Sequence, residues 1–75
     1  MGIAAERFVV GDVCIDYGYR QVVFRYEQVT RTFYRKFYDG PQEHTVPFDN
    51  GLLNEAIRFG DEITAEQYRD GKHEP

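Results

Sequence analysis

Serine is absent from this chain of 75 residues, and cysteine occurs only once, as Cys14. The absence of serine excludes a serine nucleophile. A single cysteine cannot form an intramolecular disulfide, and small secreted domains usually need several disulfides to compensate for a thin core. We therefore expect a reducing, cytoplasmic location for this protein.

Long apolar runs are missing as well. No stretch approaches the roughly 18 apolar residues of a membrane-spanning helix, and residues 1–6 lack the basic start and the apolar run of a signal peptide. No segment rich in glycine, proline and serine divides the chain. We expect one small domain over residues 1–75, frayed at residues 1–6 and 72–75, with no membrane contact.

What the chain does contain is typical of a folded globular protein. Hydrophobic residues make up 41% of the sequence and charged residues 29%, while the aromatic share of 16% predicts a core built largely from phenylalanine and tyrosine. A chain this short buries only about 60 to 65% of the surface that its unfolded form exposes. We expect marginal stability, which a partner covering more apolar surface would raise.

The formal net charge of -4 is unevenly distributed along the sequence. Residues 1–38 hold six basic and four acidic residues, whereas residues 39–75 hold three basic and nine acidic residues. Opposite charge on the two halves can simply help them pack against each other. The acidic half is also suited to a basic partner.

A β-hairpin is the best-defined local unit. Gly18 suits the first position of a two-residue type II′ turn with Tyr19, and counting outward then places Ile15 opposite Val22 on an apolar face. The other predicted pairs are Tyr17 with Arg20, Asp16 with Gln21, Cys14 with Val23, Val13 with Phe24 and Asp12 with Arg25. The alternation of side chains along both strands agrees with this one register.

Residues 19–38 can be interpreted in two ways. As a strand, residues 29–38 place Val29, Phe33 and Phe37 on one face, together with Arg31 and Arg35. As a helix, residues 19–37 gather most of the aromatic and aliphatic side chains on one arc, and no glycine, proline, asparagine or aspartate interrupts them. The density of valine, threonine and aromatic residues favours strands. The alternative is an N-terminal strand followed by a long amphipathic helix over residues 19–38.

The second half of the chain predicts a turn, a short strand and two helices. Residues 39–41 form a turn by composition, and Pro47 confines residues 44–48 to a sheet edge or a connection. A helix follows, capped by Asp49 or Asn50 and ended by Gly60. Its predicted core-facing residues are Leu52, Leu53, Ala56, Ile57 and Phe59.

The last helix has a capping box. Thr64 and Gln67 are spaced to bond each other's backbone N–H groups, and Ile63 stands where it can contact Tyr68. This helix is expected to end at Gly71. The fold class is therefore α+β, an antiparallel β-meander of three to four strands followed by two short C-terminal helices.

Catalytic and cofactor chemistry finds little support. A Cys14 nucleophile with His44 as its base would need both in one groove, which so small a domain seldom provides. Cys14, His44 and His73 match no metal-ligand spacing, and no glycine-rich loop opens a helix to hold phosphate. Asp61 and Glu62 are explained by capping and solvation. We expect no enzyme activity, no metal and no cofactor, with Cys14 as a small apolar filler.

The most informative feature of the sequence is the aromatic and basic stretch from Arg31 to Tyr38. If it is a strand, both faces carry aromatic rings, while one or two short helices cover only one face. Tyrosine and arginine are enriched at protein interfaces, so an uncovered row predicts a binding surface. Alternatively, a second copy of the chain in a dimer, or the chain's own termini, would cover this row of aromatic residues. The predicted partner-binding residues are Arg31, Tyr34, Arg35, Lys36 and Tyr38.

These patterns predict a non-catalytic protein–protein interaction module. Its acidic half suits a small inhibitor or regulator of a larger enzyme or of a nucleic-acid-handling complex. Self-association is a further expectation, because edge strands with exposed aromatic residues invite pairing. The alternative is a single-stranded nucleic-acid-binding protein that uses the tyrosine and arginine face. The net negative charge disfavours this alternative, because neutralising phosphate supplies most non-specific affinity.

Overall fold

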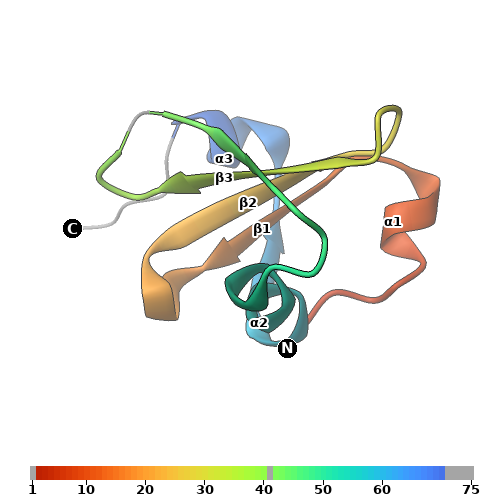
Figure 1. Cartoon of the computed structure of the whole chain (residues 1–75), viewed down its shortest axis with the longest axis horizontal. Coiled ribbons are helices and arrows are strands. Elements are labelled where there is room, and N and C mark those ends of the chain that lie inside the picture. Colours follow the sequence, from red (N-terminus) through yellow and green to blue (C-terminus); the bar gives the residue numbers. More distant parts are fainter. Residues whose placement is uncertain (1, 41, 71–75) are drawn as a thin grey trace.

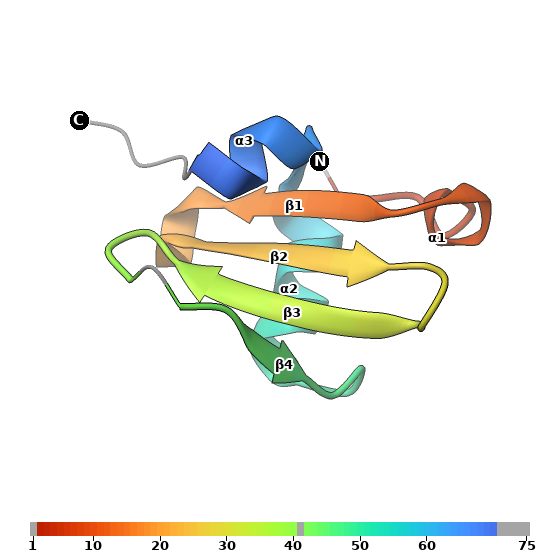
Figure 2. The same cartoon turned by 90° about the horizontal axis from the view of Figure 1, so that it is seen from above.

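The structure is a computed structural model that describes residues 2–40 and 42–70. Its centre is an antiparallel five-stranded sheet with the strand order β4-β3-β2-β1-β5, flanked by α2 on one face and α3 on the other (Figures 1 and 2). The elements in chain order are α1 (Arg7–Val10), β1 (Val13–Tyr17), the 3-10 turn η1 (Gly18–Arg20), β2 (Val22–Glu27), β3 (Thr32–Phe37), β4 (His44–Val46), α2 (Gly51–Phe59), β5 (Asp61–Ile63) and α3 (Ala65–Asp70). The α+β meander with C-terminal helices is confirmed, and the long helix over residues 19–38 is wrong.

The first hairpin forms with a different register from the predicted one. Ile15 pairs with Phe24, not with Val22, and Tyr17 pairs with Val22. The reason is the turn, which contains residues 18–21 rather than two residues and ends with Gln21 in the left-handed conformation (φ 55°). A shift of two positions keeps every side chain on its predicted face.

Strands β2 and β3 form the second hairpin, and β3 begins later than the strand predicted over residues 29–38. Arg31 has a φ of 56° and lies in the turn, so the strand begins only at Thr32. Strand β4 pairs with β3 at the edge of the sheet, as predicted, and it ends at Val46, two residues before the end of the predicted segment. The turn predicted at residues 39–41 lies partly outside the described residues, because the structure does not describe Pro41.

Helix α2 covers the larger of two apolar clusters. The Asn50 side chain accepts a hydrogen bond from the Leu53 N–H at 2.9 Å, so the predicted cap is confirmed. Leu53 and Ala56 are fully buried against a sheet face made of Val13, Ile15, Tyr17, Val22, Phe24 and Val46. Phe59, predicted on the buried arc, is 60% exposed, because the buried stripe is narrower than predicted and centres on Leu53 and Ala56.

Helix α3 lies on the opposite face, so the expectation that helices cover only one face is wrong. The predicted capping box forms, with Gln67 N–H donating to Thr64 Oγ1 at 3.1 Å and Thr64 N–H donating to Gln67 Oε1 at 2.9 Å. Tyr68 is buried with Cys14 and Val23, and Ile63 packs beside them. The chain changes faces through β5, which pairs with β1 at the sheet edge and was not predicted. The helix end predicted at Gly71 and the tail at residues 72–75 lie outside the described residues.

Two residues of the segment that was expected to fray make backbone contacts with the end of α2. Gly2 donates a backbone hydrogen bond to Gly60 at 3.0 Å, and Ile3 donates one to Ile57 at 2.8 Å. The four-residue helix α1 follows and packs the Phe8 ring against Tyr26, with 5.3 Å between the ring centroids. Within the part of the chain that the structure describes, every helix is too short or too polar to cross a membrane.

Candidate partner-binding surface

The five predicted binding residues do not share one surface. Arg31 lies in the β2–β3 turn, and Arg35 lies on the α2 face, where its guanidinium is 5.0 Å from the centre of the Phe37 ring. Tyr34 and Lys36 lie on the α3 face, and the Tyr38 hydroxyl reaches Asp16 there. The structure therefore brings together three of the five residues.

These three side chains are half-buried and make contacts within the chain. The Tyr34 hydroxyl donates to Glu27 Oε1 at 3.5 Å, and the Lys36 ammonium donates to the Tyr68 backbone carbonyl at 2.8 Å. The Tyr38 hydroxyl donates to an Asp16 carboxylate oxygen. Their contacts hold strand β3 and α3 to the rest of the sheet, and their role in partner binding stays a prediction.

Arg25 and Glu43 form the centre of a polar network on this face. Arg25 donates to both Glu43 oxygens, at 2.9 and 3.1 Å, and lies 4.1 Å above the centre of the Tyr34 ring. The Tyr68 hydroxyl donates to Glu43 Oε2 at 2.7 Å. Hydrogen bonding from Arg25 lowers the pKa of the Glu43 carboxyl, whereas burial, and then the bond to Glu43, raises the pKa of Tyr68. Because Arg25 is neutralised by Glu43 within the chain, its charge is not available to nucleic acid.

The described residues of the acidic second half of the sequence do not form one acidic face. It supplies α2 on one face of the sheet, α3 on the other and both edge strands, β4 and β5 (Figure 2). Its carboxylates are therefore spread around the molecule. Over residues 2–40 and 42–70, the two oppositely charged halves of the sequence do not form two oppositely charged sides of the molecule.

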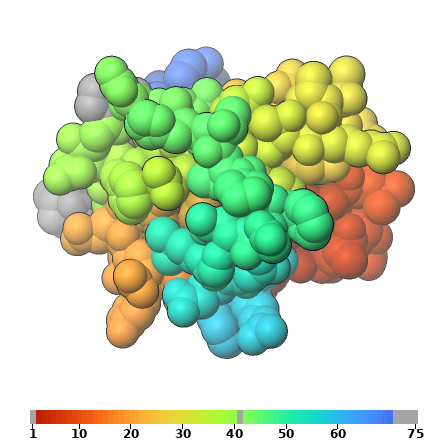
Figure 3. All heavy atoms as spheres, in the orientation of Figure 1, coloured from red at the N-terminus to blue at the C-terminus, as the bar shows by residue number. Residues whose placement is uncertain are grey.

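Exposed valines gather at one end of the molecule, which we call the valine end. Val9 and Val10 of α1 are each 72% exposed, and Val29 of the β2–β3 turn is 84% exposed. The Gln28 side chain donates to the Val9 carbonyl at 3.4 Å and so joins the turn to α1. Figure 3 shows the yellow atoms of this turn next to the red atoms of α1. Sequence reasoning missed this surface, because α1 was not predicted and Val29 was assigned to a strand.

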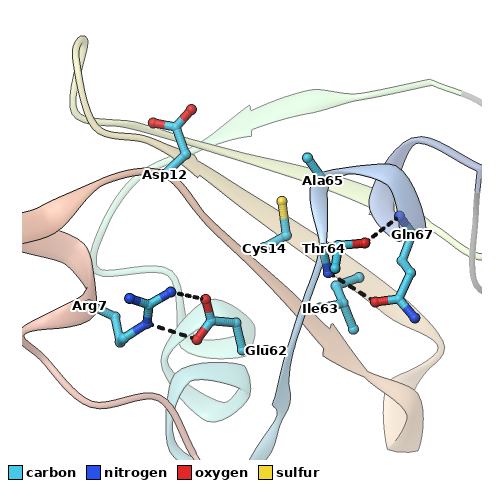
Figure 4. A pocket seen from close by; sticks show the side chains of 8 residues that line it. All are labelled: Arg7, Asp12, Cys14, Glu62, Ile63, Thr64, Ala65 and Gln67. Atoms are coloured by element: carbon cyan, nitrogen blue, oxygen red, sulfur yellow. Dashed lines mark hydrogen bonds and ion pairs between the residues drawn. The ribbon is translucent and has the colours of Figure 1, made fainter.

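An open pocket of about 530 Å³ lies between α1, β1, β5 and the start of α3 (Figure 4). The lining residues are Arg7, Asp12, Cys14, Glu62, Ile63, Thr64, Ala65 and Gln67. Arg7 donates two hydrogen bonds to the Glu62 carboxylate, at 2.9 and 2.5 Å, and so ties α1 to strand β5. The hydrogen bond from Arg7 lowers the pKa of the Glu62 carboxyl, and the same bond raises the pKa of the Arg7 guanidinium.

Cys14 in this pocket is not arranged as a nucleophile. Its side chain is buried, and burial is the main cause that raises the pKa of its thiol. His44 lies in β4, which β3 and β2 separate from the β1 strand that carries Cys14. Within residues 2–40 and 42–70 no group of three histidine, cysteine, aspartate or glutamate side chains could hold a metal ion, and His73 lies outside those residues.

Comparisons with known proteins give one consistent result. The sequence profile of the Tis1 immunity protein family matches residues 1–72. The chain is 39% identical over 67 residues to the immune protein Tis1 of Pseudomonas aeruginosa (strain UCBPP-PA14), covering 88% of this chain and 87% of that protein.

A solved structure agrees with the sequence match. The fold is similar to a chain in the crystal structure of the complex between the type VI effector Tas1 and its immunity protein, with a TM-score of 0.87 and 37% identity. The match covers 95% of this chain and 95% of that chain. The matching family consists of immunity proteins, and the similar structure is a complex of an effector with its immunity protein, so the prediction of a non-catalytic interaction protein is confirmed. The chain belongs to the Tis1 immunity protein family.

Proposed function

We propose that this protein is an immunity protein that binds a type VI effector and blocks its activity. The observation that carries the proposal is the agreement in fold and sequence with a chain from a crystallised complex of such an effector with its immunity protein, over 95% of both chains. The finer prediction of a small inhibitor of a larger enzyme is part of this proposal.

Inhibition by occlusion fits the dimensions of the molecule. A typical stable interface buries about 800 Å² on each partner, and this protein exposes 5029 Å². One end or one face is therefore large enough to cover an active-site entrance without any chemical step. The net charge of -4 favours a basic partner surface, such as a groove that handles nucleic acid.

The cytoplasm is the location we propose for this action. Cys14 is a buried free thiol, which a reducing compartment preserves. The alternative of single-stranded nucleic-acid binding is disfavoured, because Arg25 is paired with Glu43 and Lys36 donates to the carbonyls of Tyr68 and Arg69.

A co-expression experiment tests the proposed function. The Tas1-related effector of the organism that encodes this chain is expressed in bacteria, with and without this protein, and growth is followed after induction. We expect arrested growth with the effector alone and normal growth with both. The purified proteins should also elute together as one complex in gel filtration. Unrelieved growth arrest together with separate elution would overturn the proposal.

A further inference from the structure

We propose that the pocket between α1, β1 and α3 receives a lysine or arginine side chain of the effector, with Asp12 as its charged partner and the valine end as the adjoining apolar contact. The inference rests on the proposed function. Beyond that function, the inference names the part of the surface that contacts the effector and the chemistry of the effector side chain that enters the pocket.

Charge in the pocket is unbalanced in favour of a cation. Arg7 and Glu62 neutralise each other through two hydrogen bonds. Asp12 is exposed and accepts one hydrogen bond, from the Gln28 backbone N–H at 2.8 Å. Among the described residues no lysine or arginine forms an ion pair with it. The lining residues thus leave one carboxylate uncompensated, in a protein of net charge -4.

The inner wall of the pocket is apolar. Cys14, which is only 5% exposed, lies with Ile63 and Ala65 at one side of it (Figure 4). Burial is the main cause that raises the pKa of the Cys14 thiol, so this wall carries no charge of its own. Lysine and arginine have an apolar stem and a charged tip, which match an apolar wall beside a carboxylate.

The valine end supplies the apolar area that a charged contact lacks. Val9, Val10 and Val29 are more than 70% exposed, and apolar side chains gathered on a small soluble protein usually mark an interaction surface. Gln28 joins this surface to the pocket. Its backbone N–H donates to the Asp12 carboxylate, and its side-chain amide donates to the Val9 carbonyl. The two features therefore form one docking region.

The docking region is organised before any partner arrives. The Gln28 N–H fixes the Asp12 carboxylate, the Thr64–Gln67 capping box fixes the start of α3, and the Arg7–Glu62 pair holds α1 against β5. Side chains that are already ordered lose less conformational entropy on binding. The order of these side chains therefore favours binding of one inserted side chain in a preformed pocket.

Two matched variants test the inference with the purified effector. Asp12→Asn removes the charge and keeps an oxygen that can accept from Gln28, while Asp49→Asn makes the same change on the exposed connection between β4 and α2. We expect Asp12→Asn to raise the Kd for the effector by roughly tenfold in calorimetry, and Asp49→Asn by less than about twofold. Equal effects of the two variants would overturn the inference.

A second measurement reports on the pocket without the effector. The amide resonances of the protein are followed by NMR during titration with a peptide of alternating lysine and glycine, and with its glutamine and glycine counterpart. We expect the lysine peptide alone to shift the resonances of Asp12, Cys14 and Thr64, and Asp12→Asn to abolish the shifts. Absence of these shifts, or their persistence in Asp12→Asn, would contradict the inference. If the wild-type protein binds no type VI effector, the proposed function fails while this titration still decides the chemistry of the pocket.

Discussion

At the scale of single residues, Glu43 connects two elements on the α3 face through charged and polar contacts. Its carboxylate joins Arg25 of β2 and Tyr68 of α3 at the start of the edge strand β4. Hydrogen bonds to a charged group contribute more than neutral ones and leave a costly unpaired group when one partner is removed. The residue therefore matters for stability more than its partly exposed position suggests.

Glu43→Gln should lower the free energy of unfolding by about 1 kcal/mol at pH 7. The pKa of Glu43 in the folded state lies below the ordinary value of 4.5, so its contribution is full above that value and is lost as the pH falls through the folded-state pKa. Urea unfolding at pH 7 and at pH 3 checks this, and the difference from wild type should shrink at the lower pH. Glu66→Gln, an exposed change in α3, should show little difference at either pH, and a pH-independent cost of Glu43→Gln would contradict the assignment.

At the scale of elements, the junction between α2 and β5 is tightly packed. Gly60 separates the two elements, and its N–H donates to the Ala56 carbonyl at 2.7 Å. A Cβ at this position would lie 2.6 Å from Ala56 O, 2.8 Å from Ile15 Cγ2 and 2.9 Å from Asp16 O. Two of these neighbours are backbone atoms, which cannot move aside without moving the sheet or the helix.

Gly60→Ala should therefore destabilise the protein by about 2 kcal/mol, the usual cost of overpacking a filled site. Gly51→Ala is the matched control, because a Cβ at Gly51 meets no atom within 4 Å and alanine favours the helix. Thermal unfolding followed by circular dichroism measures both variants. Equal melting temperatures for the two variants would show that the junction has room.

Elements with local chemical signals could be predicted from the sequence, and the others could not. The Asn50 cap and the Thr64–Gln67 box located α2 and α3, because both signals depend on side chains a few residues apart. Helix α1 has four residues and no side-chain cap, and β5 has three residues of which only Ile63 is apolar. Elements this short are defined by tertiary contacts, such as the pairing of β5 with β1.

The candidate pocket was missed for a related reason. The predicted register paired Asp12 with Arg25 across the first hairpin. In the structure the turn is longer, so Arg25 pairs with Cys14 in the ladder and donates to Glu43. The left-handed Gln21 that lengthens the turn has no sequence signal comparable to a glycine. The shift of two positions leaves Asp12 without its predicted partner and among the residues that line the pocket.

At the scale of the whole molecule, two small cores on opposite sides of one sheet hold the fold together. The larger lies under α2 and the smaller under α3. A domain of this length has a free energy of unfolding of roughly 4 to 11 kcal/mol. A partner that binds only the folded state adds about 2.7 kcal/mol when its free concentration is 100 times the Kd. Self-association would act in the same way, and it stays a prediction.

A destabilised variant makes this dependence on the partner measurable. Leu53→Ala removes a fully buried side chain under α2 and should cost about 3 kcal/mol, so its melting temperature alone should fall well below that of wild type. Adding the effector in excess should raise the melting temperatures of both proteins, because binding favours the folded state of each. Phe59→Ala, at an exposed position of the same helix, should melt close to wild type. If the wild-type protein binds the effector but the effector leaves the melting temperature of Leu53→Ala unchanged, the α2 core must be intact before the effector binds. Binding would then not restore a weakened core.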